Sequence, residues 1–144
     1  MATLRDLLAI KGRDVVSVQL TETVVGAANL MNKRNIGGVI VYDGDRVVGI
    51  FTERDVLRRV VATGLDPAKT PVSRVMSTPV TMCEPDLSVP ECAALMTARR
   101  LRHLPVGAPD ALVGIVTIGD LLAHQVREQE TTIEQMNKYI YDIR

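Results

Sequence analysis

The sequence predicts an α+β protein of the α/β type, in which two βαββα repeats pack sheet to sheet with pseudo-two-fold symmetry and a C-terminal helix follows them. Three observations carry this prediction. The segment VGIFTERD, which begins at Val48, recurs as VGIVTIGD from Val113, at an offset of 65 residues. Each copy contains short apolar runs typical of strands and one apolar stripe with helical spacing. A heptad-like stripe then continues towards the C-terminus.

The repeat extends over most of the chain. At the same offset, apolar positions of the two halves align: Val15 with Val80, Val24 with Val89, Ala28 with Ala93, and Val41 with Val106. We therefore assign 1–62 to the first repeat, 63–70 to a linker, 71–123 to the second repeat and 124–144 to the C-terminal helix. Each repeat is small for a core of its own, so we expect the two to form one globule.

The elements of the first repeat can be assigned in order. Residues 15–18 are a short strand-like run, and the polar residues 21–23 then signal the start of a helix. This helix carries one apolar stripe, formed by Val24, Ala27, Ala28 and Met31. A hairpin follows, with strands at 38–42 and 47–51, because the Asp43-Gly44-Asp45 sequence suits a tight turn. A second helix begins near Glu53.

The second repeat has the same order of elements. A strand at 80–83 is followed by a helix-start signal at 86–88. The apolar stripe of the next helix consists of Val89, Cys92, Ala93 and Met96. Strands at 103–106 and 112–116 flank a turn at 107–110, and the last helix begins near Ile118.

The last helix extends the chain beyond the second repeat. Its apolar side alternates spacings of four and three residues and comprises Leu122, Val126, Gln129, Ile133, Met136, Ile140 and Ile143. Two interpretations remain open. The helix folds back on the core of its own chain, or it forms the seam of a homodimer.

The composition limits the classes of partner. With 47% hydrophobic and 24% charged residues, the 144-residue chain is typical of a soluble globular protein. Its 17 basic and 17 acidic residues balance, so no global positive field favours a nucleic acid. No apolar run approaches the roughly 20 residues that span a bilayer, and the N-terminus lacks the pattern of a signal peptide. We therefore expect a cytoplasmic protein without a membrane partner.

The sequence contains no motif of a metal centre or of a common catalytic site. Cys83 and Cys92 form no C-x-x-C pair and have no histidine cluster beside them, so we expect reduced thiols and no metal. The chain has no G-x-S-x-G, Walker A, H-E-x-x-H or G-x-G-x-x-G segment. We therefore predict that the protein is not an enzyme.

The residues most suited to chemistry are the pairs Thr52-x-x-Asp55 and Thr117-x-x-Asp120. Each pair lies where an apolar strand runs into a helix. One interpretation is a capping box, which satisfies free N–H groups at a helix start and needs no ligand. The other is a nucleotide site, because a helix N-terminus attracts phosphate and a carboxylate accepts hydrogen bonds from ribose hydroxyls. The recurrence of the pair favours the second interpretation.

The duplicated motif resembles that of a known family. The V-G-I-[FV]-T-x-x-D segments, the helix starts at 22–24 and 87–89, and the segment Arg102-His103-Leu104-Pro105-Val106 resemble the cystathionine-β-synthase (CBS) domain pair, or Bateman module, over about residues 5–125. The resemblance implies two clefts for AMP, ADP, ATP or a related adenosine ligand. It also implies that Asp55 and Asp120 hold ribose hydroxyls, and that Thr52 and Thr117 bind phosphate or ribose.

The resemblance extends to further residues and makes the two clefts unequal. Arg54 is a phosphate partner by this resemblance, whereas its counterpart is Gly119. Arg102 and His103 match positions that reach phosphates, and their counterparts are Gly37 and Gly38, which offer backbone only. Adenine is expected against residues 11–16 in one cleft and 78–81 in the other. This assignment adds Thr78 and Val80 to the expected site, and the matching segment 102–106 adds Pro105.

The leading hypothesis is a stand-alone regulatory module. Binding of an adenine nucleotide closes the two halves or shifts a dimer interface, and an effector protein, which the sequence does not identify, responds to the difference. The alternative is a constitutive assembly module in which the T-x-x-D pairs only cap helices. A third hypothesis keeps the clefts and replaces the nucleotide by NAD(H) or S-adenosylmethionine.

Overall fold

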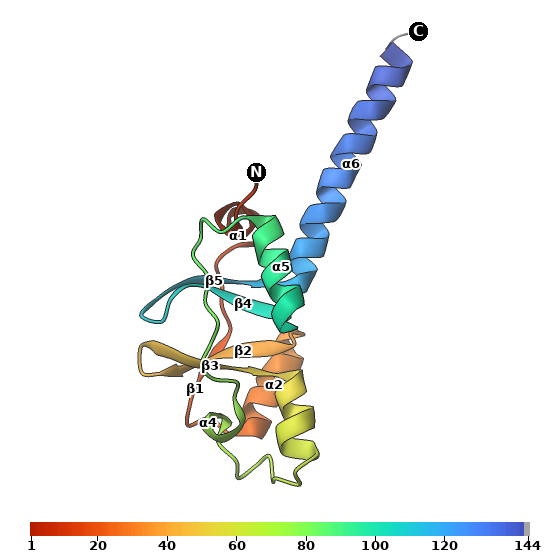
Figure 1. The fold of residues 1–144 in the computed structure, drawn as a ribbon. Helices are drawn as coiled ribbons and strands as arrows, with labels where there is room; N and C mark the ends of the chain where they lie inside the picture. Colours follow the sequence, from red (N-terminus) through yellow and green to blue (C-terminus); the bar gives the residue numbers. More distant parts are fainter. Residues whose placement is uncertain (143–144) are drawn as a thin grey trace.

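The computed structural model describes residues 1–142, and the side chains of residues 1–138. Its strands form two small sheets, one of β1 (Ser17–Gln19), β2 (Gly38–Asp43) and β3 (Arg46–Thr52), the other of β4 (His103–Ala108) and β5 (Ala111–Thr117). The helices are α1 (Leu4–Lys11), α2 (Val24–Arg34), α3 (Glu53–Asp55), which continues into the π-helix η1 (Val56–Val61), α4 (Val72–Val75), α5 (Val89–Arg99) and α6 (Ile118–Asp142). The fold is therefore the predicted mixed α/β arrangement with a C-terminal helix (Figure 1).

Both predicted hairpins are confirmed. Strand β2 pairs antiparallel with β3, and β4 pairs antiparallel with β5. Gly44 has a φ of +61° in the first turn, a backbone conformation that glycine adopts without strain. Each hairpin has a register shift at the same place in the repeat, after Val41 and after Val106. The two-fold repetition of the sequence is thus reproduced in the backbone.

The predicted strand at 80–83 is wrong. The first repeat has the three-residue strand β1, which pairs parallel with β2, but this part of the second repeat has only an isolated bridge between Cys83 and Val106. Pro79 and Pro85 flank the segment, and proline has no N–H to donate to a neighbouring strand. Pairing therefore does not extend beyond the bridge.

Each sheet has its own hydrophobic core. Each core also includes a short helix that belongs to the other half of the sequence, α1 in the second core and α4 in the first. Buried residues of α1 pack with β4, β5 and α5, and those of α4 pack with β2, β3 and α2. The glycine of each V-G-I segment allows a residue of, or next to, the added helix to lie close to the strand backbone. A Cβ on Gly114 would lie 2.9 Å from a Leu8 methyl, and one on Gly49 would meet the Met76 sulfur. Helix α1 thus joins residues 1–62 to the second core, a contact that the sequence did not indicate.

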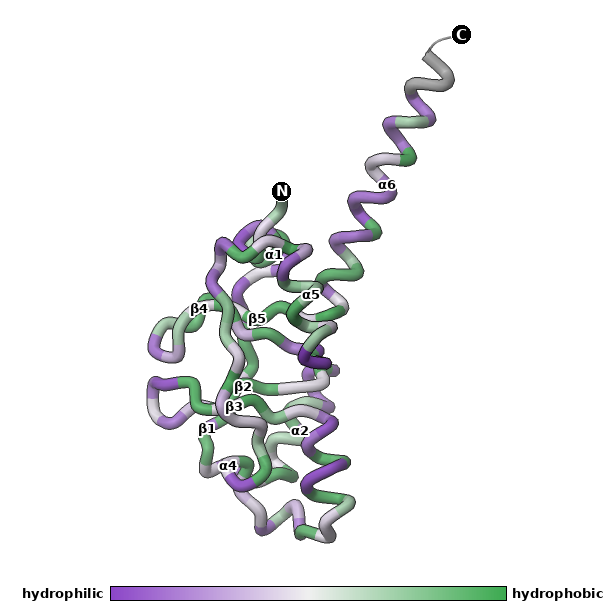
Figure 2. Tube along the Cα trace, in the orientation of Figure 1, coloured by the Kyte–Doolittle hydropathy of each residue, from purple (hydrophilic) through white to green (hydrophobic). Residues whose placement is uncertain are grey.

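Helix α6 extends away from the globule (Figure 1). Only its start contributes to a core, through Leu121. Hydrophobic residues recur among hydrophilic ones along the projecting part (Figure 2). The exposed large hydrophobic residues there are Leu122, Val126, Ile133 and Met136. The interpretation in which the stripe folds back on its own core is therefore wrong for these residues. The side chain of Ile140 and the whole of Ile143 lie outside the described residues.

Candidate nucleotide-binding clefts

Two clefts open between the repeats, one at each strand-to-helix corner. The first cleft, of about 510 Å³, lies at the Thr52 corner, and the second, of about 410 Å³, lies at the Thr117 corner. Both volumes suit a small-molecule ligand. The two clefts share Gly37, Glu53, Arg102 and His103 in their linings. Each cleft therefore draws its walls from both repeats.

At the first corner, Asp55 is buried and hydrogen-bonded through both carboxylate oxygens. Its Oδ2 accepts from the Thr52 N–H at 3.0 Å and from the Thr52 hydroxyl at 3.2 Å. Its Oδ1 accepts from the Ser77 hydroxyl at 2.8 Å and lies 3.7 Å from Nε of Arg59. A carboxylate has about four acceptor positions, so a ribose hydroxyl can still donate to this group.

The second corner repeats this geometry with a different cation. Oδ2 of Asp120 accepts from the Thr117 N–H at 2.7 Å and from the Thr117 hydroxyl at 3.0 Å. The same oxygen accepts from Nζ of Lys11 at 2.6 Å, and Lys11 also donates to the carbonyl of Ile115 at 2.8 Å. The three bonds that Asp120 accepts all go to Oδ2, which leaves Oδ1 as the acceptor for a ligand.

The capping interpretation is confirmed at the first corner, where Thr52 and Asp55 form a full capping box, and Thr117 with Asp120 shows the same reciprocal bonds. A third pair, Thr3 and Asp6, forms such a box at the start of α1, away from both clefts. The T-x-x-D pattern alone therefore does not identify a ligand site. What distinguishes the two corners is the cleft in front of each.

His103 stands between the clefts, against the glycine backbone of the first repeat. Its Nε2 would lie 3.3 Å from a Cβ on Gly38, so a larger residue at position 38 would crowd the imidazole. Burial lowers the pKa of the His103 imidazole, and the nearby carboxylate of Glu53 opposes this shift. The imidazole is therefore neutral at pH 7 and can donate one hydrogen bond and accept another.

The structure brings most of the predicted site residues to the clefts. The first cleft is lined by Gly37, Thr52, Arg54, Asp55, Arg102 and His103. The second is lined by Gly37, Gly38, Arg102, His103 and Thr117, whereas Asp120 is not in its lining and is ion-paired with Lys11, which is. Lys11, Asp14 and Val16 also line it, where adenine is expected.

Four predicted residues line neither cleft: Thr78, Val80, Pro105 and Asp120. The Thr78 hydroxyl donates to the carbonyl of Val48 at 2.9 Å, and Pro105 is buried within β4. From this part of the chain the first cleft instead takes Ser77, which an isolated bridge holds opposite Ile50.

The sequence did not single out Glu53, Ser77, Arg58 or Arg100, although all four line the first cleft. For Ser77 no local signal exists, because its contact with Asp55 depends on the bridge to β3. For the arginines a signal was available in the repeat itself. Arg58 aligns with Ala123 and Arg100 with Asn35, so each is a basic residue present in one repeat only.

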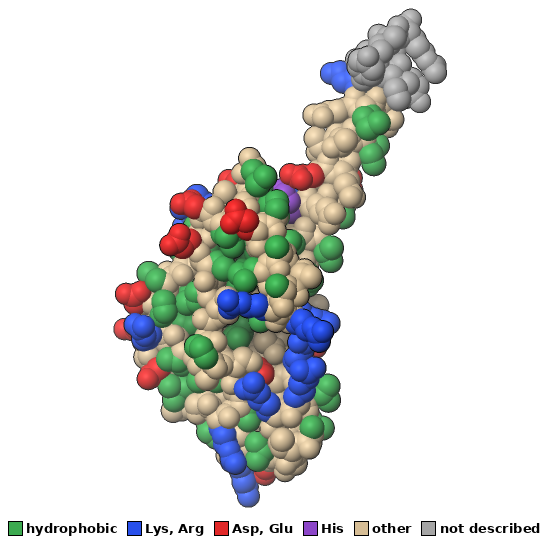
Figure 3. Space-filling model, in the orientation of Figure 1, with side chains coloured by type: hydrophobic (Ala, Val, Ile, Leu, Met, Phe, Trp, Pro, Cys, Tyr) green, Lys and Arg blue, Asp and Glu red, His purple; other side chains and the backbone are tan. Residues whose placement is uncertain are grey.

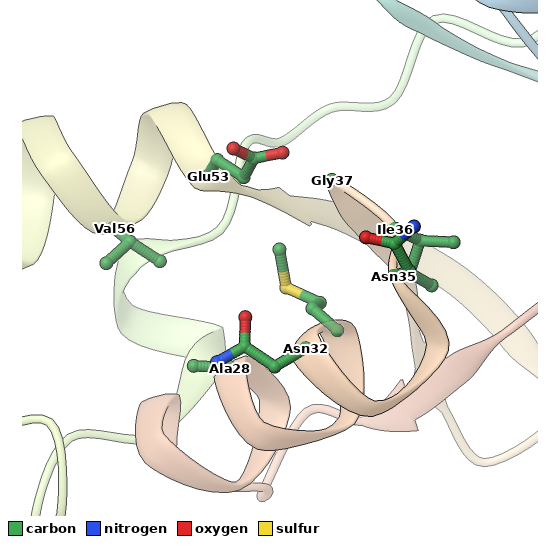
Figure 4. A pocket seen from close by; sticks show the side chains of 8 residues that line it. Ala28, Asn32, Asn35, Ile36, Gly37, Glu53 and Val56 are labelled. Atoms are coloured by element: carbon green, nitrogen blue, oxygen red, sulfur yellow. The ribbon is translucent and has the colours of Figure 1, made fainter.

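A further pocket of about 490 Å³ lies within the first repeat, between α2 and the start of η1 (Figure 4). Asn32 and Asn35 come from its α2 side, and Glu53 lies across from them. The lining includes no basic residue, so it does not suit a phosphate.

The remaining predictions concern metal, thiols and membrane. Among the described residues, no group of three or more His, Cys, Asp or Glu could hold a metal ion. Cys83 and Cys92 are free thiols, and burial raises the pKa of Cys92 to about 11, which keeps it protonated at pH 7. No helix in the described part of the chain is long and apolar enough to cross a membrane.

Comparisons with known proteins agree on one family. The CBS domain model matches residues 4–62 and 72–127. The CBS domain-containing protein YhcV of Bacillus subtilis is 34% identical over 90% of this chain and 89% of its own length. A structure of a protein with CBS domains from Burkholderia ambifaria superposes with a TM-score of 0.85 at 38% identity, over 89% of this chain and 96% of that one. The hexameric CBS-CP12 protein from bloom-forming cyanobacteria matches with a TM-score of 0.73 at 30% identity, over 85% and 70% of the two chains.

Proposed function

Because this chain belongs to the CBS-domain family, we propose that it is a regulatory module that binds AMP, ADP or ATP in its two clefts and transmits their occupancy to an effector protein. One observation carries the proposal: each T-x-x-D corner at a strand-to-helix junction faces a cleft of several hundred Å³ that both repeats line. In this role the corner carboxylates, which backbone N–H groups hold in place, act as hydrogen-bond acceptors for the ligand.

The contacts of α1 suggest how occupancy of the second cleft is transmitted. A ribose hydroxyl that reaches Asp120 meets Lys11, the last residue of α1. Helix α1 packs against β5 and α6. A ligand that binds one arrangement of Lys11 more tightly than another therefore shifts the position of α1 relative to α6.

A calorimetric titration of the whole chain with AMP, ADP and ATP tests this proposal. We expect at least one of the three to bind, and to raise the melting temperature at a concentration well above its Kd. NAD and S-adenosylmethionine enter the same titration as competing adenosine ligands. If none of the five compounds binds or shifts the melting temperature, nucleotide sensing is excluded.

A specific observation favours a second role, homodimer assembly. The stripe of α6 leaves four large apolar side chains about half exposed, at Leu122, Val126, Ile133 and Met136. A helix face of this kind is usually buried against a partner. In this role α6 joins two copies whether or not a ligand is bound, so light scattering without ligand distinguishes assembly alone from assembly that depends on a nucleotide.

A further inference from the structure

Four arginines surround the first cleft, and we refer to Arg54, Arg58, Arg100 and Arg102 as the arginine cluster. Arg54 and Arg58 come from α3 and η1 of the first repeat, whereas Arg100 and Arg102 lie between α5 and β4 of the second. Basic side chains gather on the molecular surface where α5 ends and η1 begins (Figure 3). Only the assembled pair of repeats brings these guanidinium groups to one place.

The cluster is only partly balanced by the protein, because the four arginines share the cleft with two carboxylates, those of Glu53 and Asp55. Among the described residues, none of the four arginines forms an ion pair with a carboxylate. The guanidinium of Arg54 instead donates to the carbonyl of Arg100 at 3.3 Å, which places two basic residues side by side. The arginines outnumber the carboxylates of this cleft and repel one another, so the arrangement is suited to an anion from outside the chain.

The backbone beneath the cluster is unusual in two places. Arg100 ends α5 with φ +54° and ψ +41°, a left-handed conformation that strains most side chains. The equivalent residue of the first repeat, Asn35, has the same φ, and asparagine tolerates it better. Arg58 lies in the π-helix η1, a rare geometry that is frequent at functional sites.

The second cleft provides an internal comparison. At the repeat offset of 65, the four arginines correspond to Gly119, Ala123, Asn35 and Gly37, which are all uncharged. Three of these counterparts line the second cleft, where Lys11 is already paired with Asp120. Arg102 lines both clefts. The first cleft therefore has four arginines against the carboxylates of Glu53 and Asp55, whereas in the second Lys11 and Arg102 are balanced by Asp14 and Glu53.

We infer that the first cleft is specific for the polyphosphate chain of a nucleoside di- or triphosphate, which the arginine cluster binds, while the second cleft takes a less charged adenosine ligand. The binding of the nucleoside in this inference rests on the proposed function, whereas the binding of the phosphates by the arginine cluster does not. Guanidinium groups bind phosphate oxygens through paired hydrogen bonds, so several of them favour a chain of phosphates over a single one.

The test is calorimetry of the whole chain and of the double variant Arg58→Ala/Arg100→Asn, which installs the residues of the other repeat. The ligands are AMP, ATP and inorganic tripolyphosphate, in magnesium-free buffer. We expect the Kd of ATP and of tripolyphosphate to rise by about tenfold or more in the variant, and that of AMP to change by less than about threefold. Arg46→Ala, at the far end of the β2–β3 hairpin, removes one charge outside both clefts and should leave all three values unchanged.

Different outcomes separate the inference from the proposed function. Equal affinities for AMP and ATP in the native chain, or an unchanged Kd of ATP in the double variant, would overturn the specificity while nucleotide binding stands. If tripolyphosphate binds through the arginines but no adenosine compound binds, the cluster is supported and the proposed function fails. A melting temperature of the double variant at or above that of the native chain would establish that it folds.

Discussion

At the scale of single residues, the position of His103 makes stability depend on pH. Burial lowers the pKa of its imidazole in the folded chain, so the unfolded chain binds more protons below the ordinary value of about 6.5. The contribution to stability is therefore complete above that pH and is lost as the pH falls. We expect His103→Gln to show a smaller loss of melting temperature between about pH 7.5 and 5.5. An identical loss in both proteins would contradict this role.

The ion pair of Lys11 with Asp120 gives a second prediction at this scale. Both side chains are at most 30% exposed, and Lys11 also donates to a backbone carbonyl. We expect Lys11→Met to lower the free energy of unfolding by about 1 kcal/mol in urea titrations. A double-mutant cycle with Asp120→Asn measures the coupling between the two residues. Additive losses would mean that the pair makes no net contribution.

At the scale of elements, α6 carries the prediction on assembly. Ile133→Glu places a charge in the middle of the exposed stripe, so we expect the molar mass from light scattering to fall towards that of a single chain. Thr131→Glu adds the same charge to the opposite face of α6 and serves as the control. A mass unchanged by Ile133→Glu would show that this stripe does not form the interface.

The hairpins and the helices α2 and α5 could be predicted because their patterns are local. Apolar runs on either side of a turn, such as Asp43-Gly44 in the first hairpin, and stripes of helical spacing depend only on neighbours along the chain. The packing of α1 and α4 could not be predicted in this way, since periodicity shows that a helix has an apolar face but not which sheet covers it. The apolar run at 80–83 predicts a strand that the structure lacks for a related reason, because pairing also depends on the flanking residues, here Pro79 and Pro85.

At the scale of the whole molecule, the repeat predicted the two corners but not the composition of the clefts. Thr52 and Thr117 were visible as a duplicated motif, and the structure places each beside a cleft. The arginine cluster was only partly visible, because Arg54 and Arg100 are 46 residues apart and meet only when the two repeats pack together. Differences between repeats, and not only their similarities, therefore indicate where such clefts diverge.

The account depends on carboxylates that both cap a helix and accept hydrogen bonds from a ligand. Substitution by asparagine retains an acceptor for the cap and removes the charge, so the fold is expected to persist. Asp6→Asn is the matched control, because Asp6 caps α1 in the same way without facing either cleft.

The most direct measurement is calorimetry of the adenine nucleotide that binds best, with the native chain, Asp55→Asn/Asp120→Asn and Asp6→Asn. We predict a rise in Kd of about tenfold or more in the double variant and none in the control. Equal affinity in all three proteins would contradict the account.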